Sequence, residues 1–418
     1  MQKVDVFFRG WGQSWLVGTL AQTGAQVLFE YSDEALRRGV KFSELKVPLR
    51  RETFSNFPHY FGGLPGFVAD ALPDGWGLLL MDRIFTKAGR NPSSLTHLDR
   101  LSFVGERAMG ALAFLPSADM HLDPEELTLV QLAEASQIIL EAGETTALMA
   151  LALIGGSPHG ARPKALVHID AAEQVSTLPN ALGVPWLVKF PAQGEHAEVC
   201  AIEYAYAEAA RLCGIDIPAT RHFDLGKNLA AFAVERFDRR GQIRVPIQTF
   251  AAALHANFRV PQLDYQTVLR ATRFMTGSEK EVLKAFERAV FNVVFNNRDD
   301  HAKNFSFRMT ERFEWELSPA YDLTFNSGPG GYHQTAVLGE AKAPGREHLL
   351  KLAKQDNLDP SVAVRIIDRI RDLAPLFEAL LDASAVRKVT KDHIKKAVGQ
   401  NVRRCGATAQ KSRPPRAC

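Results

Sequence analysis

The chain has 418 residues, of which 46% are hydrophobic and 23% charged, and its formal net charge is +3. These values are ordinary for a globular protein, exclude a largely disordered chain, and give no independent reason to expect nucleic-acid binding. No apolar run approaches the length of a membrane span, and the N-terminus lacks the apolar core of a signal peptide, so we expect no membrane association.

The cysteines form no CxxC pair and match no zinc-binding spacing; they are Cys200, Cys213, Cys405 and Cys418. Free cysteines are typical of a reducing compartment, where they act as small apolar residues. We therefore predict a cytoplasmic location.

The first fifty residues predict strands, because apolar residues alternate or cluster there between glycine-containing and polar turns. Residues 60–105 predict loops and helices, with a turn signal at Pro73-Asp74-Gly75. Strand character returns at Met109–Leu115. We take residues 1–110 as a β-rich N-terminal domain.

Helical periodicity follows at Thr128–Ala142 and Thr145–Ile154, where apolar residues recur with a period near that of the α-helix. The glycine-rich loop Gly155–Gly160 comes next and leads into a predicted strand, Lys164–Ile169.

A second strand is predicted at Pro185–Phe190, a helix at Ala197–Cys213 with Gly214 as its C-cap, and another strand at Phe232–Phe237. Residues 111–245 therefore form a mixed second domain.

The remainder is mostly helical. Ser278–Phe295 predicts an amphipathic helix, and helices resume from Arg346 to about Gln400. Between them, alternating apolar residues predict a β-hairpin over 305–317. We predict a helical domain at 246–400 and a basic, flexible tail at 401–418, and for the whole chain an α+β, bilobal fold.

The strongest catalytic signal is the segment Arg298-Asp299-Asp300-His301-Ala302-Lys303-Asn304, read as RD-x4-N. This spacing is typical of a protein-kinase catalytic loop, in which an aspartate accepts the proton of the attacking hydroxyl and an asparagine holds magnesium. Asp299 would be that base and Asn304 that ligand, while Lys303 would add positive charge near the γ-phosphate. The alternatives are a polar helix-to-strand loop and a metal site made of Asp299, Asp300 and His301.

Asp322 follows the predicted hairpin, at the position where kinases carry a second magnesium-binding aspartate. A simple turn residue is the alternative. Lys189 lies in an otherwise apolar strand. This position predicts either a lysine that holds the α- and β-phosphates of a nucleotide or a side chain that extends into solvent. Glu203 is its predicted partner by position, with Glu195 and Glu198 as alternatives.

Two further segments fit a nucleotide site only weakly on their own. The glycine-rich loop, with Ser157 and Gly160, predicts either a phosphate cradle or a connecting turn. The segment VERFDRR, with Glu235 and Phe237, predicts either a hinge that contacts adenine or a charged strand end.

Taken together, the segments SPHGARPKAL, LVKFP, AVERFDRR, NNRDDHAKNFSF and SPAYDL resemble the HipA family of bacterial toxin–antitoxin kinases, in the family's order. The front segments VGTLA, VLFEYSDEA and FGGLPGFVADALPDGWG resemble the family's N-terminal domain. The similarity extends to about residue 400.

The resemblance implies roles for individual residues, with ATP and Mg²⁺ as cofactors. Asp299 matches the catalytic base, Asn304 and Asp322 match magnesium ligands, and Lys189 matches the nucleotide-binding lysine. It further implies that Glu235 and Phe237 contact adenine, that Asp238 and His301 approach the ribose, and that Ser157 is autophosphorylated. Pro158 departs from the family pattern, because proline stiffens the loop and removes one backbone N–H.

The resemblance also implies a serine/threonine kinase toxin whose substrates include aminoacyl-tRNA synthetases. A helix-turn-helix antitoxin is the implied partner, and operator DNA would be bound only through that antitoxin. A small-molecule kinase and a catalytically idle co-repressor remain alternative hypotheses.

Overall fold

The computed structural model describes residues 2–118, 124–155 and 158–406, so Ser157 and residues 407–418 of the predicted tail lie outside the described part. By its internal contacts the chain divides into two compact units. Unit 1 comprises Met1–Tyr204, Ile217–Phe258 and Ala302–Tyr321, and unit 2 comprises Ala205–Asp216, Arg259–His301 and Asp322–Cys418.

Unit 1 begins with a five-stranded antiparallel sheet in the order β4-β3-β2-β1-β5. Val4, Val6 and Phe8 alternate toward the buried side of β1, as the period of two along a strand requires. The strands are β1 (Lys3–Phe8), β2 (Trp15–Thr23), β3 (Gln26–Tyr31), β4 (Thr53–Phe54) and β5 (Leu112–Leu115). The helices of this part are α1 (Asp33–Arg38), α2 (Gly66–Ala69), α3 (Gly75–Lys87) and α4 (His97–Val104).

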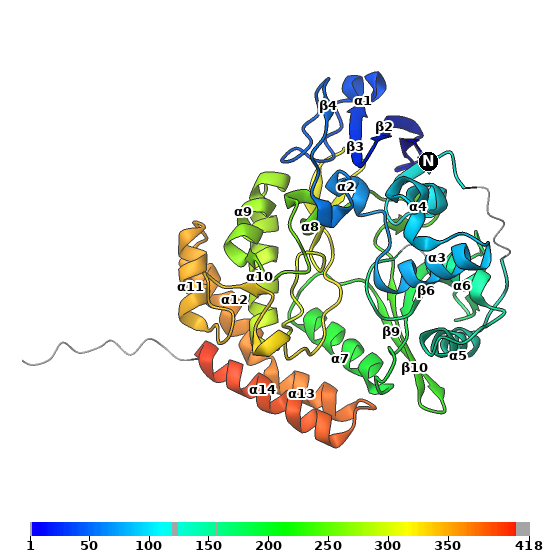
Figure 1. Ribbon diagram of the computed structural model, residues 1–418. Helices are drawn as coiled ribbons and strands as arrows, with labels where there is room; N and C mark the ends of the chain where they lie inside the picture. The colour runs from blue at the N-terminus through cyan, green and yellow to red at the C-terminus, as the bar shows by residue number, and fades with distance from the viewer. Residues whose placement is uncertain (1, 119–123, 156–157, 407–418) are drawn as a thin grey trace, which may run out of the picture. The chain divides into compact units, whose positions relative to one another are not determined.

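A second antiparallel sheet in unit 1 has the order β7-β6-β8-β10-β9, and α5 and α6 pack against it (Figure 1). Its strands are β6 (Lys164–Ile169), β7 (Val175–Ser176), β8 (Val184–Lys189), β9 (Thr220–Gly226) and β10 (Leu229–Glu235). The associated helices are α5 (Leu129–Leu140), α6 (Leu148–Gly155) and α7 (Glu198–Leu212), the last of which begins in unit 1 and ends in unit 2. The strand predicted at Phe232–Phe237 begins earlier and ends at Glu235, which leaves Phe237 in the connection that follows.

The predicted hairpin is present, and its strands complete unit 1. β15 pairs with β16 and also with β13, which gives a three-stranded sheet. These last elements of unit 1 are β11 (Arg239–Arg240), β12 (Ile243–Arg244), β13 (Ile247–Thr249), α8 (Phe250–Leu254), β15 (Ser306–Met309) and β16 (Trp315–Leu317).

Unit 2 is mainly helical, and its C-terminal helices group together (orange to red in Figure 1). The amphipathic helix predicted at Ser278–Phe295 is α10, and its apolar stripe is buried as the helical period predicts. The elements are β14 (Leu263–Asp264), α9 (Tyr265–Thr276), α10 (Glu279–Val294), β17 (Thr335–Ala336), α11 (Arg346–Gln355), α12 (Pro360–Asp372), α13 (Ala374–Ala383) and α14 (Lys388–Gly406).

The helical part extends further than the predicted boundary at residue 400. Helix α14 continues to Gly406, with Asn401 and Cys405 buried, and the Asn401 side chain donates to Asn296 Oδ1 at 3.2 Å. Residues 401–406 are therefore helix rather than flexible tail. Within the described ranges, no helix combines the length and the apolar character needed to cross a bilayer.

Candidate active site

Lys189, the last residue of β8, forms an ion pair with Glu203 of α7 in unit 1. Lys189 Nζ lies 2.5 Å from Glu203 Oε1, and Glu203 is almost completely buried. Arg162 approaches the other carboxylate oxygen at 3.5 Å and binds Glu195 at 2.9 Å. Of the three candidate partners, Glu203 is thus the one that Lys189 contacts, while Glu195 pairs with Arg162 and Glu198 begins α7.

A second lysine, which the sequence analysis did not single out, lies beside this pair. Lys164 opens β6 directly opposite Lys189 in the sheet register, and it donates to the backbone carbonyl of His159. Burial and the positive charge of Lys189 lower the pKa of Lys164 to about 7. Two amines thus lie together on adjacent strands, and an anion such as a phosphate bound beside them would favour the charged form of Lys164.

The end of the glycine-rich loop is held by the N-terminal part of unit 1. The Gly160 N–H donates to Asp74 Oδ1 at 2.5 Å, and the Trp76 N–H donates back to the Gly160 carbonyl at 3.1 Å. The Trp76 indole N–H donates to the Lys164 carbonyl at 3.0 Å. These bonds fix the loop end and the start of β6 against helix α3.

Asp74 also binds the lysine of the predicted catalytic loop. Lys303 Nζ lies 2.7 Å from Asp74 Oδ2 and 4.0 Å from the centre of the Phe258 ring. Burial alone would raise the pKa of Asp74, but His159 and Lys303 hold it well below its usual range. The carboxylate of Asp74 is therefore ionised and joins two segments that the sequence analysis assigned to phosphate binding.

Tyr321 connects the catalytic loop with the segment after β10. Its hydroxyl donates to the Lys303 carbonyl at 2.7 Å, and its ring lies 5.6 Å from the Phe237 ring, centre to centre. Asn304 follows Lys303 and is half-buried. Unit 1 thus brings together Phe237, Tyr321 and Lys303 from segments distant in the sequence.

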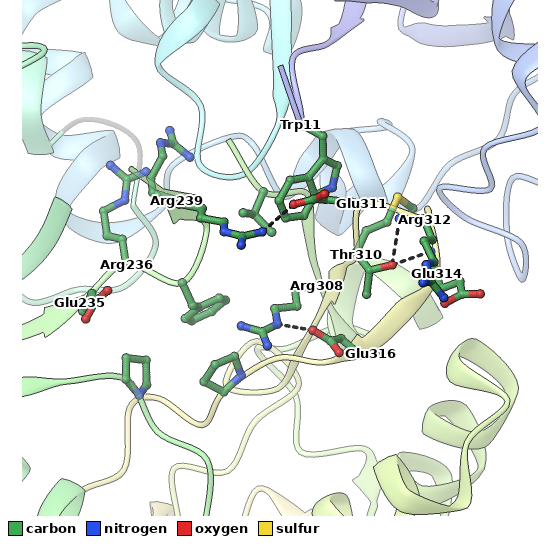
Figure 2. Close-up of a pocket in the computed structure, with 16 residues that line it drawn as sticks. Trp11, Glu235, Arg236, Arg239, Arg308, Thr310, Glu311, Arg312, Glu314 and Glu316 are labelled. Atoms are coloured by element: carbon green, nitrogen blue, oxygen red, sulfur yellow. Dashed lines mark hydrogen bonds and ion pairs between the residues drawn. The ribbon is translucent and has the colours of Figure 1, made fainter. Parts of the chain in front are cut away.

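Glu235 and Phe237 line a pocket of about 710 Å³ in unit 1. In Figure 2, Arg236 and Arg239 lie on one side with Glu235, and the charged side chains of the hairpin lie toward the other, among them Arg308, Glu311, Arg312, Glu314 and Glu316. Arg308 pairs with Glu316 at 2.5 Å, and Lys189 is not among the lining residues. The pocket therefore borders the predicted hinge rather than the lysine cluster, and adenine binding at Glu235 and Phe237 stays a prediction.

Asp238 is buried and its carboxylate is fully engaged. It accepts from Arg236 and Arg239 at 2.8 Å each and from the Gly110 N–H at 2.8 Å. Burial alone would raise the pKa of Asp238, but the two guanidinium groups hold it far below its usual range. These contacts give Asp238 a structural role, and its approach to ribose stays a prediction.

In unit 2, Asp299 keeps an accessible carboxylate. Its side chain is 39% exposed, and Oδ1 accepts a hydrogen bond from Gln334 Nε2 at 2.7 Å. His301 Nε2 lies 3.9 Å from the same oxygen. An oriented and accessible carboxylate is what a general base requires.

The neighbouring Asp300, unlike Asp299, is buried. Its buried carboxylate accepts from the Tyr265 hydroxyl at 2.8 Å, from His333 Nδ1 at 3.0 Å, and from the backbone N–H groups of Gln334 and Thr335 at 2.8 and 3.1 Å. Asp300 therefore anchors the loop to the segment that contains β17. The alternative of a metal site at Asp299, Asp300 and His301 is wrong, because the described residues contain no group of three or more His, Cys, Asp or Glu suited to a metal.

Asp322 has a backbone φ of +54°, in the left-handed region that non-glycine residues seldom adopt. Such conformations concentrate at functional sites, where the surrounding fold maintains them. A carboxylate from Asp322 and an amide oxygen from Asn304 are both ligands of the kind that magnesium prefers. Each side chain by itself is thus of a type that fits magnesium, and its role as a ligand stays a prediction.

Arg162, Lys164 and Asp74 were missed as site residues. The first two lie within the segment SPHGARPKAL, where their basic character next to a glycine-rich loop was an available signal. Asp74 gave no comparable signal, because Pro-Asp-Gly is typical of any turn and its partners are far away in the sequence.

Two family models match the chain. The HipA N-terminal domain matches residues 9–115, and the HipA-like C-terminal domain matches residues 156–376, more than half of the chain. The sequence is also similar to the Sinorhizobium fredii protein "Putative kinase Y4dM", with 27% identity over an alignment of 349 residues that covers 79% of each protein.

The fold is similar to that of HipA from the Shewanella oneidensis MR-1 toxin–antitoxin system, in a structure that also contains HipB and operator DNA. The TM-score is 0.70, the sequence identity is 17%, and the match covers 96% of each chain. The predicted α+β fold class is therefore confirmed.

Proposed function

The chain belongs to the HipA family, as its motifs predicted, and we propose that it is an ATP-dependent serine/threonine protein kinase that acts as the toxin of a toxin–antitoxin pair. The observation that carries the proposal is the buried ion pair between Lys189 and Glu203 beside Lys164. In kinases, a strand lysine held by a helix glutamate binds the α- and β-phosphates. The similarity to the Sinorhizobium fredii protein "Putative kinase Y4dM" supports the same activity.

Each residue has a distinct task in this proposal. Lys189 and Lys164 hold phosphate oxygens, and Glu203 orients Lys189. Asp299 orients the attacking hydroxyl and accepts its proton, while Asn304 and Asp322 hold magnesium. When bound, Mg-ATP would supply the phosphoryl group and leave as ADP, and the metal would offset the charge on the phosphate oxygens.

Catalysis then depends mainly on positioning, because phosphoryl transfer requires little covalent chemistry from the protein. The hydrogen bond from Gln334 to Asp299 supports this, since it restricts the rotation of the carboxylate that must meet the hydroxyl. Adenine is assigned to Glu235 and Phe237, beside the ring of Tyr321.

The proposed partners follow from the family. A helix-turn-helix antitoxin would bind the protein and carry it to operator DNA, and the cytoplasmic protein substrate would be a translation component such as an aminoacyl-tRNA synthetase. The Shewanella HipA structure, with HipB and operator DNA, supports the antitoxin. Ser157 is the proposed autophosphorylation site, next to the restraining Pro158.

The test is to incubate the chain with a cell lysate and ATP labelled at the γ-position, with ATP labelled at the α-position as the matched control. We expect label on protein only from γ-labelled ATP and only with magnesium. Label on small molecules alone would indicate a small-molecule kinase. ATP binding without any transfer would indicate an idle co-repressor.

A further inference from the structure

Asp74 stands at the N-cap of helix α3 but does not cap it. An aspartate at this position normally accepts a hydrogen bond from the first turn of its own helix, which stabilises the helix by about 1 kcal/mol. No such bond is formed by the Asp74 side chain. Both carboxylate oxygens instead accept from other segments, Oδ1 from Gly160 and Oδ2 from Lys303.

These two donors are the ones that the sequence analysis linked to the phosphates of ATP. Gly160 ends the glycine-rich loop, and Lys303 belongs to the loop that follows the catalytic base. A carboxylate and a phosphate present the same kind of anionic oxygen acceptor to an N–H group and an ammonium group. On the basis of the proposed function, we infer that Asp74 is a positioning residue that competes with the phosphates of ATP for Gly160 and Lys303.

The backbone contacts around Asp74 keep it close to these donors. Gly75 has a φ of +44°, and a Cβ atom there would lie 2.6 Å from the Gly160 carbonyl oxygen, so only glycine permits this approach. The backbone N–H of Trp76 donates a hydrogen bond to the same Gly160 carbonyl. These contacts hold the start of α3 against the end of the glycine-rich loop, which keeps the Asp74 carboxylate within reach of both donors.

Charge makes the competition unfavourable for ATP. The ionised Asp74 repels an incoming phosphate, and each donor must exchange its carboxylate partner for a phosphate oxygen. Asp74 thus lowers the affinity for ATP, and it holds the loop end and Lys303 in place until they are exchanged. Adenosine carries no phosphate and meets no such competition.

The experiment compares the binding of Mg-ATP and of adenosine to the full chain and its variants by calorimetry. Asp74→Asn removes the charge at constant shape. Asp74→Ser provides a preferred N-cap residue, so helix α3 should still begin at the same place. The matched control is Asp82→Asn, which removes a carboxylate from the same helix, where Asp82 pairs with Arg100 at 2.6 Å.

We expect both Asp74 variants to bind ATP about tenfold more tightly than wild type, a gain that corresponds to about 1.4 kcal/mol. Adenosine affinity should not change, and Asp82→Asn should bind both ligands as wild type does. Unchanged or weaker ATP binding by the Asp74 variants would overturn the inference alone. Absence of ATP binding in wild type and all variants would overturn the proposed function, and this inference with it.

Discussion

The charged side chains of unit 1 satisfy one another, whereas unit 2 leaves its key carboxylate accessible. In unit 1, Lys189 pairs with Glu203 and Lys303 pairs with Asp74. In unit 2, Asp299 accepts a hydrogen bond from Gln334 and keeps 39% of its side chain exposed. Under the proposed function, a phosphate that enters the first region would have to exchange partners, while a hydroxyl that approaches the second would meet an oriented carboxylate.

The same contrast exists between neighbours in the sequence. Asp299 is accessible, and Asp300 is buried with four donors on its carboxylate. One carboxylate of the pair is thus exposed, while the other fixes the loop. Substitutions at these positions separate the two roles.

The largest effect on stability is expected from Asp300→Asn. The amide of asparagine keeps one acceptor oxygen, but its NH₂ group replaces the other oxygen. Some of the four buried donors that surround Asp300 would therefore face an N–H group and lose their acceptor. We expect the free energy of unfolding to fall by about 3 kcal/mol, against less than about 0.5 kcal/mol for Asp299→Asn. Urea unfolding of the two variants measures the difference, and equal losses would contradict the anchoring role of Asp300.

Lys164 should make the stability of the fold depend on pH. Its pKa is lowered from 10.5 to about 7, so between these values the unfolded chain binds more protons than the folded chain. The free energy of unfolding should therefore rise with pH across this window relative to Lys164→Met, by at most about 1.4 kcal/mol per pH unit. Denaturant unfolding below and above pH 7 tests this, and parallel pH curves for the two proteins would refute the buried, depressed lysine.

A smaller effect is expected from Asp322→Asn. A neutral amide is a poorer ligand for magnesium than a carboxylate, so the affinity for Mg-ATP should fall by about tenfold. Binding of ATP without magnesium is the internal control and should be unaffected. If the variant kept the full magnesium dependence, Asp322 would be a turn residue only.

The smallest effect concerns the C-terminus. A chain ending at Gly406 should unfold and bind ATP as the full chain does, because residues 407–418 contain two adjacent prolines and scattered charge but no apolar periodicity. A chain ending at Gln400 is the comparison, and it should be less stable because it lacks the buried Asn401 and Cys405. Thermal unfolding of both chains would reveal a contribution of the last twelve residues.

The order and type of most elements followed from the sequence because their patterns are local. Alternation identified β6 and the β15–β16 hairpin, and apolar residues at helical spacing identified α10. The end of α14 was placed too early, since residues 401–406 are rich in polar and basic side chains and their burial depends on partners elsewhere in unit 2.

The sequence predicted the site less well where residues that lie far apart in the chain contact one another. Lys189 and Glu203 could be paired because a strand and the next helix are adjacent. From the sequence, Asp300 could be a metal ligand, but in the structure its carboxylate accepts hydrogen bonds from Tyr265 and His333. Asp74 could be a simple turn residue, but in the structure its carboxylate binds Lys303. Sequence patterns thus identified the residue types, and the tertiary partners determined which of them are structural.

The central claim is that unit 1 binds the nucleotide while Asp299 performs the chemistry, and one variant tests both halves. In Asp299→Asn, calorimetric affinity for Mg-ATP should remain within about threefold of wild type, whereas phosphoryl transfer from γ-labelled ATP should fall by about 10³-fold or more. Transfer at the wild-type rate, or loss of ATP binding together with transfer in a folded variant, would contradict the account.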